Sequence, residues 1–362
     1  MRIAVLGVGL IGGSIGLAAR QRLDAEVLGF DPDPGTLDRA VEGDAIDGGA
    51  STVAKACEGA DVVFCAGPVA GLAELATSAL EACGPETVVT DVGSTKRDIV
   101  AALGADERFI GGHPLAGAET SGVENARADL FEGARWYLTP KSARSSGLLY
   151  DRLQRTVTGL GARVQAIDAE AHDRLMATIS HLPHVVANVL VGQAVEELTR
   201  DSERMPEVGP SFRDTTRVAG ANPAIWGDIF ASNSEAVAEA VDGVAERLRE
   251  AAALIREGER DAVAAWHAEA GSDRRRLLET ELAGGPLREL RVVVTNRPGT
   301  IAELALALGE AGVNIEDMAL YPAPDMTSGA VSLWVSGDEQ AERAASLVRQ
   351  LGHSVSAVGN GA

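Results

Sequence analysis

The N-terminus constrains the fold most strongly, because the short apolar run Arg2–Leu6 leads directly into the glycine pattern G-V-G-L-I-G. A helical pattern follows through Ala19, and a second apolar run, Glu26–Phe30, ends at Asp31. The three glycines of the pattern are Gly7, Gly9 and Gly12. In a dinucleotide-binding βαβ unit the first makes a tight turn, the second lets a pyrophosphate approach the backbone, and the third lets the helix pack on the strand. We therefore predict such a unit rather than a glycine-rich turn without a ligand.

NAD is the cofactor that this unit favours. The carboxylate of Asp31 would accept hydrogen bonds from the adenosine ribose hydroxyls, and its charge would repel the 2′-phosphate of NADP. The N-terminus of the following helix would offer unpaired N–H groups to the phosphates. The predicted cofactor-binding residues, three of them from later strand ends, are Gly7, Gly9, Leu10, Ile11, Gly12, Asp31, Gly67, Pro68 and Ser94.

Composition and charge argue against several classes of partner. The 362 residues are 46% hydrophobic and 23% charged, which is typical of a globular protein. The net charge of −21 would repel nucleic acid and anionic membranes, and we expect no run apolar enough to span a membrane. The three cysteines, Cys57, Cys65 and Cys83, show no C-x-x-C or Cys/His ligand pattern. We therefore expect a cytoplasmic protein with reduced thiols and no metal site.

Strand and helix patterns continue to alternate through residues 1–168, which we predict to be one Rossmann-type domain. The further apolar runs are Asp61–Cys65, Thr87–Asp91, Phe109–Gly112, Arg135–Thr139 and Arg163–Ala166. Alternating strands and helices predict a parallel, doubly wound α/β sheet, whose ligands lie beyond the carboxyl ends of the strands. Ser94 lies at such an end, although Ser94 and Thr95 could equally cap the helix expected from near Lys96.

One histidine, His113, lies at another strand end, in the segment 111–122 that reads G-G-H-P-L-A-G-A-E-T-S-G. A histidine fixed there by a following proline is placed like a catalytic base. A structural loop histidine is the alternative. The candidate cofactor residues at neighbouring strand ends favour the catalytic interpretation.

From Ala169 to about Leu282 the pattern becomes helical, and we predict an all-helical domain over residues 169–283 that dimerises through its apolar surface. His181 and His184 flank Pro183, which predicts a kinked helix. A zinc site would need a third ligand. Further on lie the polar residues Arg213, Asp214 and Arg217, near the aromatic Phe212 and Trp226. They form either a carboxylate-binding pocket or a surface ion pair.

After a plausible linker, Gly284-Gly285-Pro286, residues 287–362 follow a β-α-β-β-α-β pattern, which predicts a ferredoxin-like α+β domain. The pattern contains no Cys/His cluster and no plausible base. We therefore expect a ligand-binding or assembly module there.

Five motifs, taken in order, resemble the prephenate dehydrogenase family over roughly residues 1–282. They are G-L-I-G-G-S-I-G, D-V-G-S-T-K, G-G-H-P-L-A-G-A-E-T-S-G-V-E-N-A, I-S-H-L-P-H-V-V-A and G-P-S-F-R-D-T-T-R-V-A-G-A-N-P-A-I-W-G-D-I-F. The resemblance implies NAD-dependent oxidative decarboxylation of prephenate to 4-hydroxyphenylpyruvate, in tyrosine biosynthesis. It implies that His113 takes the hydroxyl proton, that Ser94 hydrogen-bonds the same hydroxyl, and that Arg217 binds the ring carboxylate. Further pocket candidates are Asp214 as an orienting acid, with His184, Arg213, Glu119 and Trp226.

The tail resembles an ACT regulatory domain, which implies feedback by tyrosine bound between the ACT domains of a homodimer. The candidate effector residues are Asn296, Gly299 and Asn314. One departure from the family pattern is Asn296, because this turn commonly reads D-R-P-G and here reads N-R-P-G.

Three other interpretations remain open at this point. An arogenate dehydrogenase would act on a substrate whose side chain carries an amine. A β-hydroxyacid or 6-phosphogluconate-type dehydrogenase would need a lysine in the helical domain, and no lysine follows Lys141. A non-catalytic amino-acid sensor would use the NAD and ACT modules without turnover.

Overall fold

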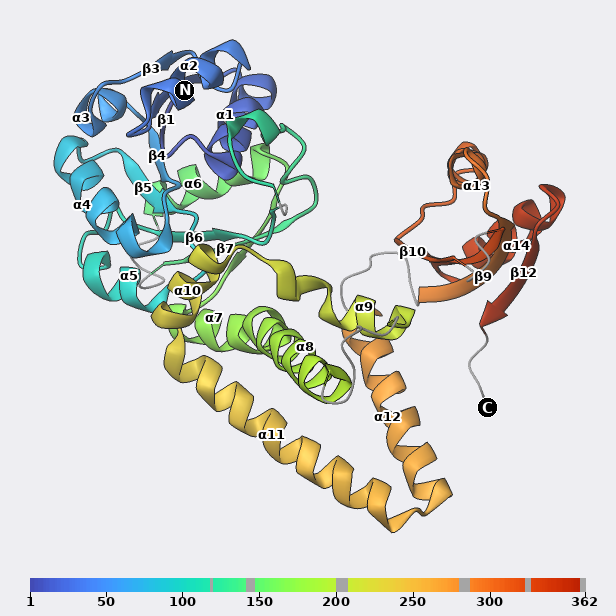
Figure 1. Cartoon of the computed structure of the whole chain (residues 1–362). Coiled ribbons are helices and arrows are strands. Elements are labelled where there is room, and N and C mark those ends of the chain that lie inside the picture. Colours follow the sequence, from blue (N-terminus) through green and yellow to red (C-terminus); the bar gives the residue numbers. More distant parts are fainter. Residues whose placement is uncertain (118–119, 141–146, 200–207, 280–286, 323–326, 359–362) are drawn as a thin grey trace. The chain divides into compact units, whose positions relative to one another are not determined.

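The computed structural model describes residues 1–117, 120–140, 147–199, 208–279, 287–322 and 327–358. These residues form two compact units, Met1–Glu246 and Arg247–Ala362, each described below by itself (Figure 1).

The first unit is built on a five-stranded parallel sheet with the order β3-β2-β1-β4-β5, which confirms the Rossmann-type prediction. Its strands are β1 Arg2–Leu6, β2 Glu26–Phe30, β3 Gly48–Gly49, β4 Val62–Cys65 and β5 Val88–Asp91. Its helices are α1 Leu10–Leu23, α2 Pro34–Glu42, α3 Val53–Cys57, α4 Leu72–Ala82 and α5 Arg97–Leu103. Alternate residues of the central strands enter two separate hydrophobic cores, one on each face of the sheet. Apolar runs with little polar alternation are expected where both faces are covered.

A second, three-stranded sheet corrects the prediction of one wholly parallel sheet. It has the order β6-β7-β8, with β6 Gly111–Pro114, β7 Arg135–Thr139 and β8 Arg163–Ala166. Strands β7 and β8 are parallel because α6, Gly147–Gly159, carries the chain back between them. Strands β6 and β7 are antiparallel, since the described residues between them form only the short 3₁₀ turn η2, Val123–Asn125. A single parallel bridge joins Val89 of β5 to Phe109, just before β6.

Helices make up the rest of the first unit. They are α7 Ala169–Met176, the π turn η3 Ala177–His181, α8 Leu182–Thr199, α9 Pro210–Thr216, the 3₁₀ turn η4 Arg217–Gly220, α10 Pro223–Ser232 and the start of α11 Ser234–Glu257. The irregularity expected at Pro183 appears as the π turn immediately before it. Proline has no N–H and its ring crowds the carbonyl four residues earlier, so the regular hydrogen-bond ladder cannot pass through this point.

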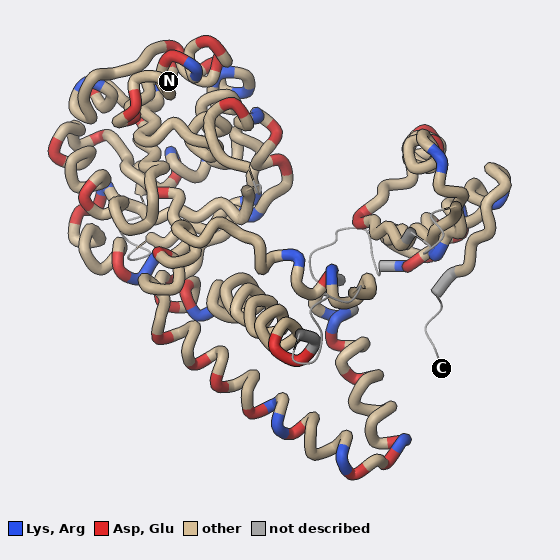
Figure 2. The backbone as a smooth tube through the Cα atoms, in the orientation of Figure 1, with Lys and Arg blue, Asp and Glu red and all other residues tan. Residues whose placement is uncertain are grey.

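Helix α8 carries exposed apolar side chains, Val189, Leu190 and Val195. Its charged residues lie only near its C-terminal end (Figure 2). By length and composition, Ala169–Glu197 could cross a membrane, which corrects the expectation that no run is apolar enough. This is weak evidence for a membrane helix, because the core helix of a soluble protein passes the same test. The stretch also holds buried Asp173, whose charge is expensive in hydrocarbon. An exposed apolar surface of this kind suits packing against another protein surface.

The second unit contains an antiparallel sheet with the order β10-β11-β9-β12, and it confirms the ferredoxin-like prediction. The elements after α12, Arg260–Glu279, are β9 Leu287–Thr295, α13 Thr300–Glu310, β10 Asp317–Pro322, β11 Ser328–Ser336, α14 Asp338–Gln350 and β12 Ser354–Val358. One face of the sheet and the two helices share a hydrophobic core. The predicted linker Gly284-Gly285-Pro286 lies outside the described residues.

Candidate active site

The glycine loop between β1 and α1 has the geometry of a dinucleotide cradle. Gly7 has a φ of +95°, and a Cβ there would lie 2.7 Å from the carbonyl oxygen of Ala66. A Cβ on Gly12 would overlap the carbonyl oxygen of Gly7. A Cβ on Gly9 would meet no protein atom within 4 Å. The chain's own packing therefore requires the first and third glycines, whereas the second leaves the backbone open to a ligand, as a pyrophosphate needs.

Asp31 is held against this loop from the end of β2. Its Oδ2 accepts a hydrogen bond of 2.9 Å from the Val8 N–H, and its Oδ1 accepts one of 3.0 Å from the Asp33 N–H. The carboxylate is therefore fixed beside the loop where ribose hydroxyls would be recognised. Of the other predicted cofactor residues, Leu10, Ile11 and Gly67 are half-buried and Pro68 is exposed.

Gly9 and Gly12 give a matched pair of substitutions. We expect Gly9→Ala to leave the thermal midpoint nearly unchanged while weakening NAD binding, because the new methyl group meets no protein atom. We expect Gly12→Ala to lower the midpoint, since its Cβ overlaps backbone and overpacking typically costs about 1–3 kcal/mol. Thermal unfolding and NAD titration of both variants check this. Equal effects on stability would contradict the cradle described above.

A fully buried ion pair joins Asp91, at the end of β5, to Lys96, just before α5. The Asp91 carboxylate also accepts hydrogen bonds from the N–H groups of Gly93 at 2.8 Å and Gly112 at 3.1 Å. Gly112 directly precedes His113. This carboxylate therefore fixes the loop that carries Ser94 relative to the strand that carries the histidine.

The helix α5 is capped from a distance, which corrects the suggestion that Ser94 or Thr95 caps it. The Asp173 carboxylate on α7 accepts hydrogen bonds from the N–H groups of Lys96 at 2.8 Å and Arg97 at 2.9 Å. Thr95 instead donates to the Ser232 hydroxyl at 3.0 Å, at the end of α10. Ser94 is half-buried on the loop, close in sequence to these contacts.

His113 is the first member of a buried hydrogen-bonded series. It is 8% exposed, and its Nδ1 lies 2.9 Å from the Nε2 of His172. The Nδ1 of His172 lies 2.8 Å from the Oδ1 of Asp173. Burial lowers the pKa of His113 well below its usual value, and the neighbouring His172, Lys96 and His181 lower it further. His113 is therefore neutral near neutral pH and able to accept a proton.

Trp226 of α10 contacts the rings of both His181 and His184. The ring of His184 stacks on it with centroids 3.4 Å apart, and the ring of His181 meets it edge-on at 5.9 Å. Asn233 links this group to the first one, because its Nδ2 donates to the Asp173 carbonyl at 2.8 Å and lies 3.3 Å from the Nδ1 of His181. The histidines thus have aromatic and amide partners, and no group of three metal-binding side chains occurs among the described residues.

Arg217 lies near this aromatic group. Burial lowers the pKa of His184, and the charge of Arg217 lowers it further, so the two side chains are electrostatic neighbours. Arg213 and Asp214 are exposed on α9, one turn earlier. The predicted pocket residue Glu119 lies outside the described residues.

Four polar residues at this site escaped prediction as site residues. They are Asp91, Lys96, His172 and Asp173. The signal was present in A-H-D-R-L-M, where a His-Asp pair faces the same side as apolar residues of an amphipathic helix. A buried polar pair needs partners, and a helix alone cannot supply them.

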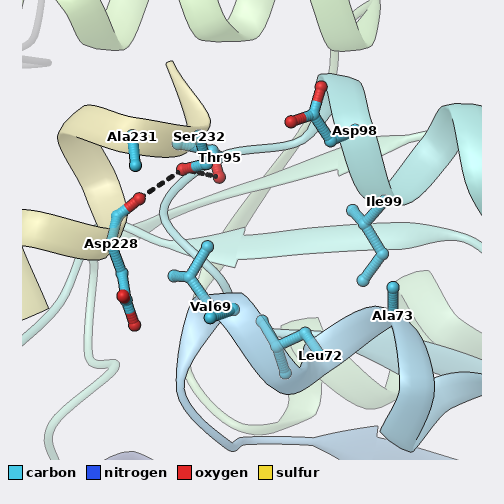
Figure 3. Close-up of a pocket in the computed structure, with 10 residues that line it drawn as sticks. Val69, Leu72, Ala73, Thr95, Asp98, Ile99, Asp228, Ala231 and Ser232 are labelled. Carbon is cyan, nitrogen blue, oxygen red and sulfur yellow. Dashed lines mark hydrogen bonds between the residues drawn. The ribbon is translucent and has the colours of Figure 1, made fainter. Parts of the chain in front are cut away.

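A cavity of about 330 Å³ borders the same loop but shares none of the predicted site residues (Figure 3). Thr95 and Ser232 meet at its edge, and the aspartates Asp98 and Asp228 belong to its lining. The rest of its lining is apolar, drawn mainly from Val69–Ala73 and from Ile99 and Ala231. It therefore lacks the positive charge that a carboxylate substrate would need.

The histidines predict a measurable pH dependence of stability. Burial lowers the pKa of His181 to about 4, against 6.5 for a free histidine. As the pH falls below about 6.5, the unfolded chain binds a proton that the folded chain refuses, so the free energy of unfolding decreases until about pH 4. Urea unfolding at a series of pH values measures this, and His181→Asn should make the curve flatter. Identical slopes for the variant and the native chain would contradict the assignment.

The fold and site together define a class: a dehydrogenase with a dinucleotide-binding domain, a buried histidine at a strand end and a helical second domain. Two family models match it, the nucleotide-binding domain of prephenate dehydrogenase over residues 15–166 and the prephenate dehydrogenase dimerization domain over residues 168–269. The chain belongs to the prephenate dehydrogenase family.

Individual relatives agree with this membership. The prephenate dehydrogenase of Bacillus subtilis is 30% identical over 94% of each chain. The crystal structure of Aquifex aeolicus prephenate dehydrogenase, in complex with hydroxyphenyl propionate and NAD⁺, is 31% identical with a TM-score of 0.72, covering 76% of this chain and 98% of that one. The arogenate dehydrogenase of Synechocystis is 25% identical with a TM-score of 0.67, covering 76% of this chain and all of that one.

Proposed function

We propose that this chain oxidises prephenate with NAD⁺ as cofactor and releases CO₂, giving 4-hydroxyphenylpyruvate for tyrosine biosynthesis. The observation that carries the proposal is the buried, neutral His113, hydrogen-bonded at the end of a strand in a chain of this family. The open backbone at Gly9 and the fixed carboxylate of Asp31 fit the dinucleotide. The bound NAD⁺ supplies the hydride acceptor.

Ser94 aligns the substrate, and His113 transfers the proton. Ser94 hydrogen-bonds the substrate hydroxyl. His113 accepts the proton of that hydroxyl while the carbon that bears it loses a hydride. The ring carboxylate then leaves as CO₂, and the electron pair of the broken bond completes the aromatic ring. His113 returns the proton to the phenolic oxygen, so the reaction consumes no net proton.

The substrate pocket combines one aromatic wall with basic groups. The stacked rings of His184 and Trp226 offer a flat surface to the substrate ring. Arg217 binds the ring carboxylate through its guanidinium fork, with Asp214 orienting it. Arg213 and Glu119 complete the predicted pocket.

We further propose three domains, with boundaries at 1–168, 169–283 and 287–362, in a homodimer in the cytoplasm. The match to a dimerization domain and the exposed side chains of Val189 and Leu190 on α8 support the dimer. Sedimentation of the purified chain tests it, and a monomer at micromolar concentration would contradict it.

The C-terminal domain is proposed to be an ACT domain that binds tyrosine near Asn296, Gly299 and Asn314. Its ferredoxin-like sheet and the left-handed φ of +92° at Gly299, at the start of α13, support this. The Asn296 N–H donates to the Thr327 carbonyl at 3.0 Å, which fixes the turn. Calorimetry that detects no tyrosine binding, together with kinetics that show no inhibition, would end the proposal.

Side-by-side kinetics test the choice of substrate. NADH formation is measured with prephenate and with arogenate, each with and without tyrosine. We expect a higher kcat/KM for prephenate. A higher value for arogenate would replace the proposal with the arogenate dehydrogenase alternative, which the similarity to the Synechocystis enzyme keeps relevant.

A further inference from the structure

We infer that Asp173 and His172 are positioning residues that hold neutral His113 in one tautomer, with its proton on Nδ1 and a free lone pair on Nε2. This inference rests on the proposed function, in which His113 must accept a proton. It assigns a role to two residues on α7 that lie outside the five family motifs.

The Asp173 carboxylate determines which ring nitrogen of His172 carries a proton. The Asp173 carboxylate receives three hydrogen bonds, from His172 and from the N–H groups of Lys96 and Arg97. Burial raises the pKa of Asp173, but these hydrogen bonds outweigh it and bring the pKa below its usual value. An ionised carboxylate can only accept, so the Nδ1 of His172 must carry a proton.

The second step passes this constraint to His113. A neutral His172 with its proton on Nδ1 has a bare Nε2, which can only accept a hydrogen bond. The Nδ1 of His113, 2.9 Å away, must therefore be the donor. A neutral imidazole carries one proton, so the Nε2 of His113 is left bare.

Buried side chains surround this series. His172 is fully buried, and the ring of Tyr137 packs edge-on against it with centroids 5.5 Å apart. The charged Lys96 and the neighbouring His181 both disfavour an extra proton on His113. Lys96 is itself paired with the buried carboxylate of Asp91.

The contacts of Asp173 and His172 decide which of the two residues gives the better test of the positioning role. Asp173 holds α5 and His172 with the same carboxylate, so replacing it would disturb both. The two ring nitrogens of His172 face members of the series, Nε2 the Nδ1 of His113 and Nδ1 the Oδ1 of Asp173. Substitutions at His172 are therefore the cleaner test.

The first arm of the test is independent of substrate. Nitrogen-15 spectra of the histidine-labelled chain, which has six histidines, report the protonated nitrogen of each ring. His113→Asn assigns the His113 signals. We expect a proton on Nδ1 and a bare Nε2 for His113 in the native chain without ligands. A proton on Nε2 would overturn the inference, even if prephenate proves to be the substrate.

The second arm is kinetic. His172→Leu removes the acceptor, and we expect kcat to fall about 100-fold or more while the KM for prephenate changes little. His172→Gln keeps an acceptor oxygen near the position of Nε2, and we expect it to recover most of the loss. A kcat of native size in His172→Leu would overturn the inference. Inactive native protein with the expected spectrum would instead contradict the proposed function alone.

Discussion

Replacing His113 by asparagine is expected to lower kcat by about 100- to 10,000-fold, the range for loss of a general base. Asparagine fits the space of a histidine but cannot take a proton from the substrate hydroxyl. The dissociation constants for NAD and prephenate should change little, because the binding groups lie on other elements. Steady-state kinetics and equilibrium titration of the same preparation measure both effects.

This variant also separates the enzyme from a non-catalytic sensor. A sensor with the same modules would keep all its measurable behaviour after His113→Asn. Folding is controlled by comparing thermal midpoints, since His113 hydrogen-bonds His172 in the interior. An unchanged kcat in a folded variant would remove His113 from the reaction.

Replacing Arg217 by alanine should weaken binding of prephenate by about 2–4 kcal/mol, the loss of a charged hydrogen-bonded partner. That corresponds to a KM raised roughly 30- to 1,000-fold, since each 1.4 kcal/mol is a factor of ten. The KM for NAD should be unaffected, because the cofactor residues lie on the parallel sheet. Initial rates over a wide range of prephenate concentration measure the effect.

Arg213→Ala is the matched control for this variant. Both arginines lie in the same short segment and both side chains are exposed, but the structure places only Arg217 as an electrostatic neighbour of His184. Arg213→Ala should therefore raise the KM less than Arg217→Ala. Normal binding of prephenate by Arg217→Ala would show that the carboxylate is held elsewhere.

Local signals in the sequence were sufficient for most of the fold. The glycine pattern, the apolar runs and the alternating strand and helix signals of residues 287–362 each depend on neighbours in the chain. The parallel sheet and the ferredoxin-like domain were therefore predictable. The antiparallel pairing of β6 with β7 was not predictable. It depends on the absence of a crossing helix among the described residues between 115 and 134, and the strand signals on either side look the same with or without such a helix.

The site was predicted in part, for a related reason. Gly12 and Asp31 act on Gly7 and Val8 of the same βαβ unit, and the motif carries that information. Asp173 and His172 act on partners 77 and 59 residues away in the chain. A contact between residues so far apart in the chain produces no local pattern in the sequence, so it becomes visible only in the folded structure.

The proposal for Ser94 illustrates how such contacts change an interpretation. Its position before a helix was equally consistent with capping and with substrate binding. The carboxylate of Asp173 supplies the cap from another element, which leaves the Ser94 hydroxyl available for the reaction.

The central claim, that this chain oxidises prephenate with His113 as the base, is tested most directly by product analysis. Native chain and His113→Asn are each incubated with prephenate and NAD⁺, and NADH, CO₂ and 4-hydroxyphenylpyruvate are quantified. We predict the three products in equal amounts from the native chain and almost none from the variant. Equal product formation by both proteins, or no product from the folded native chain, would contradict the claim.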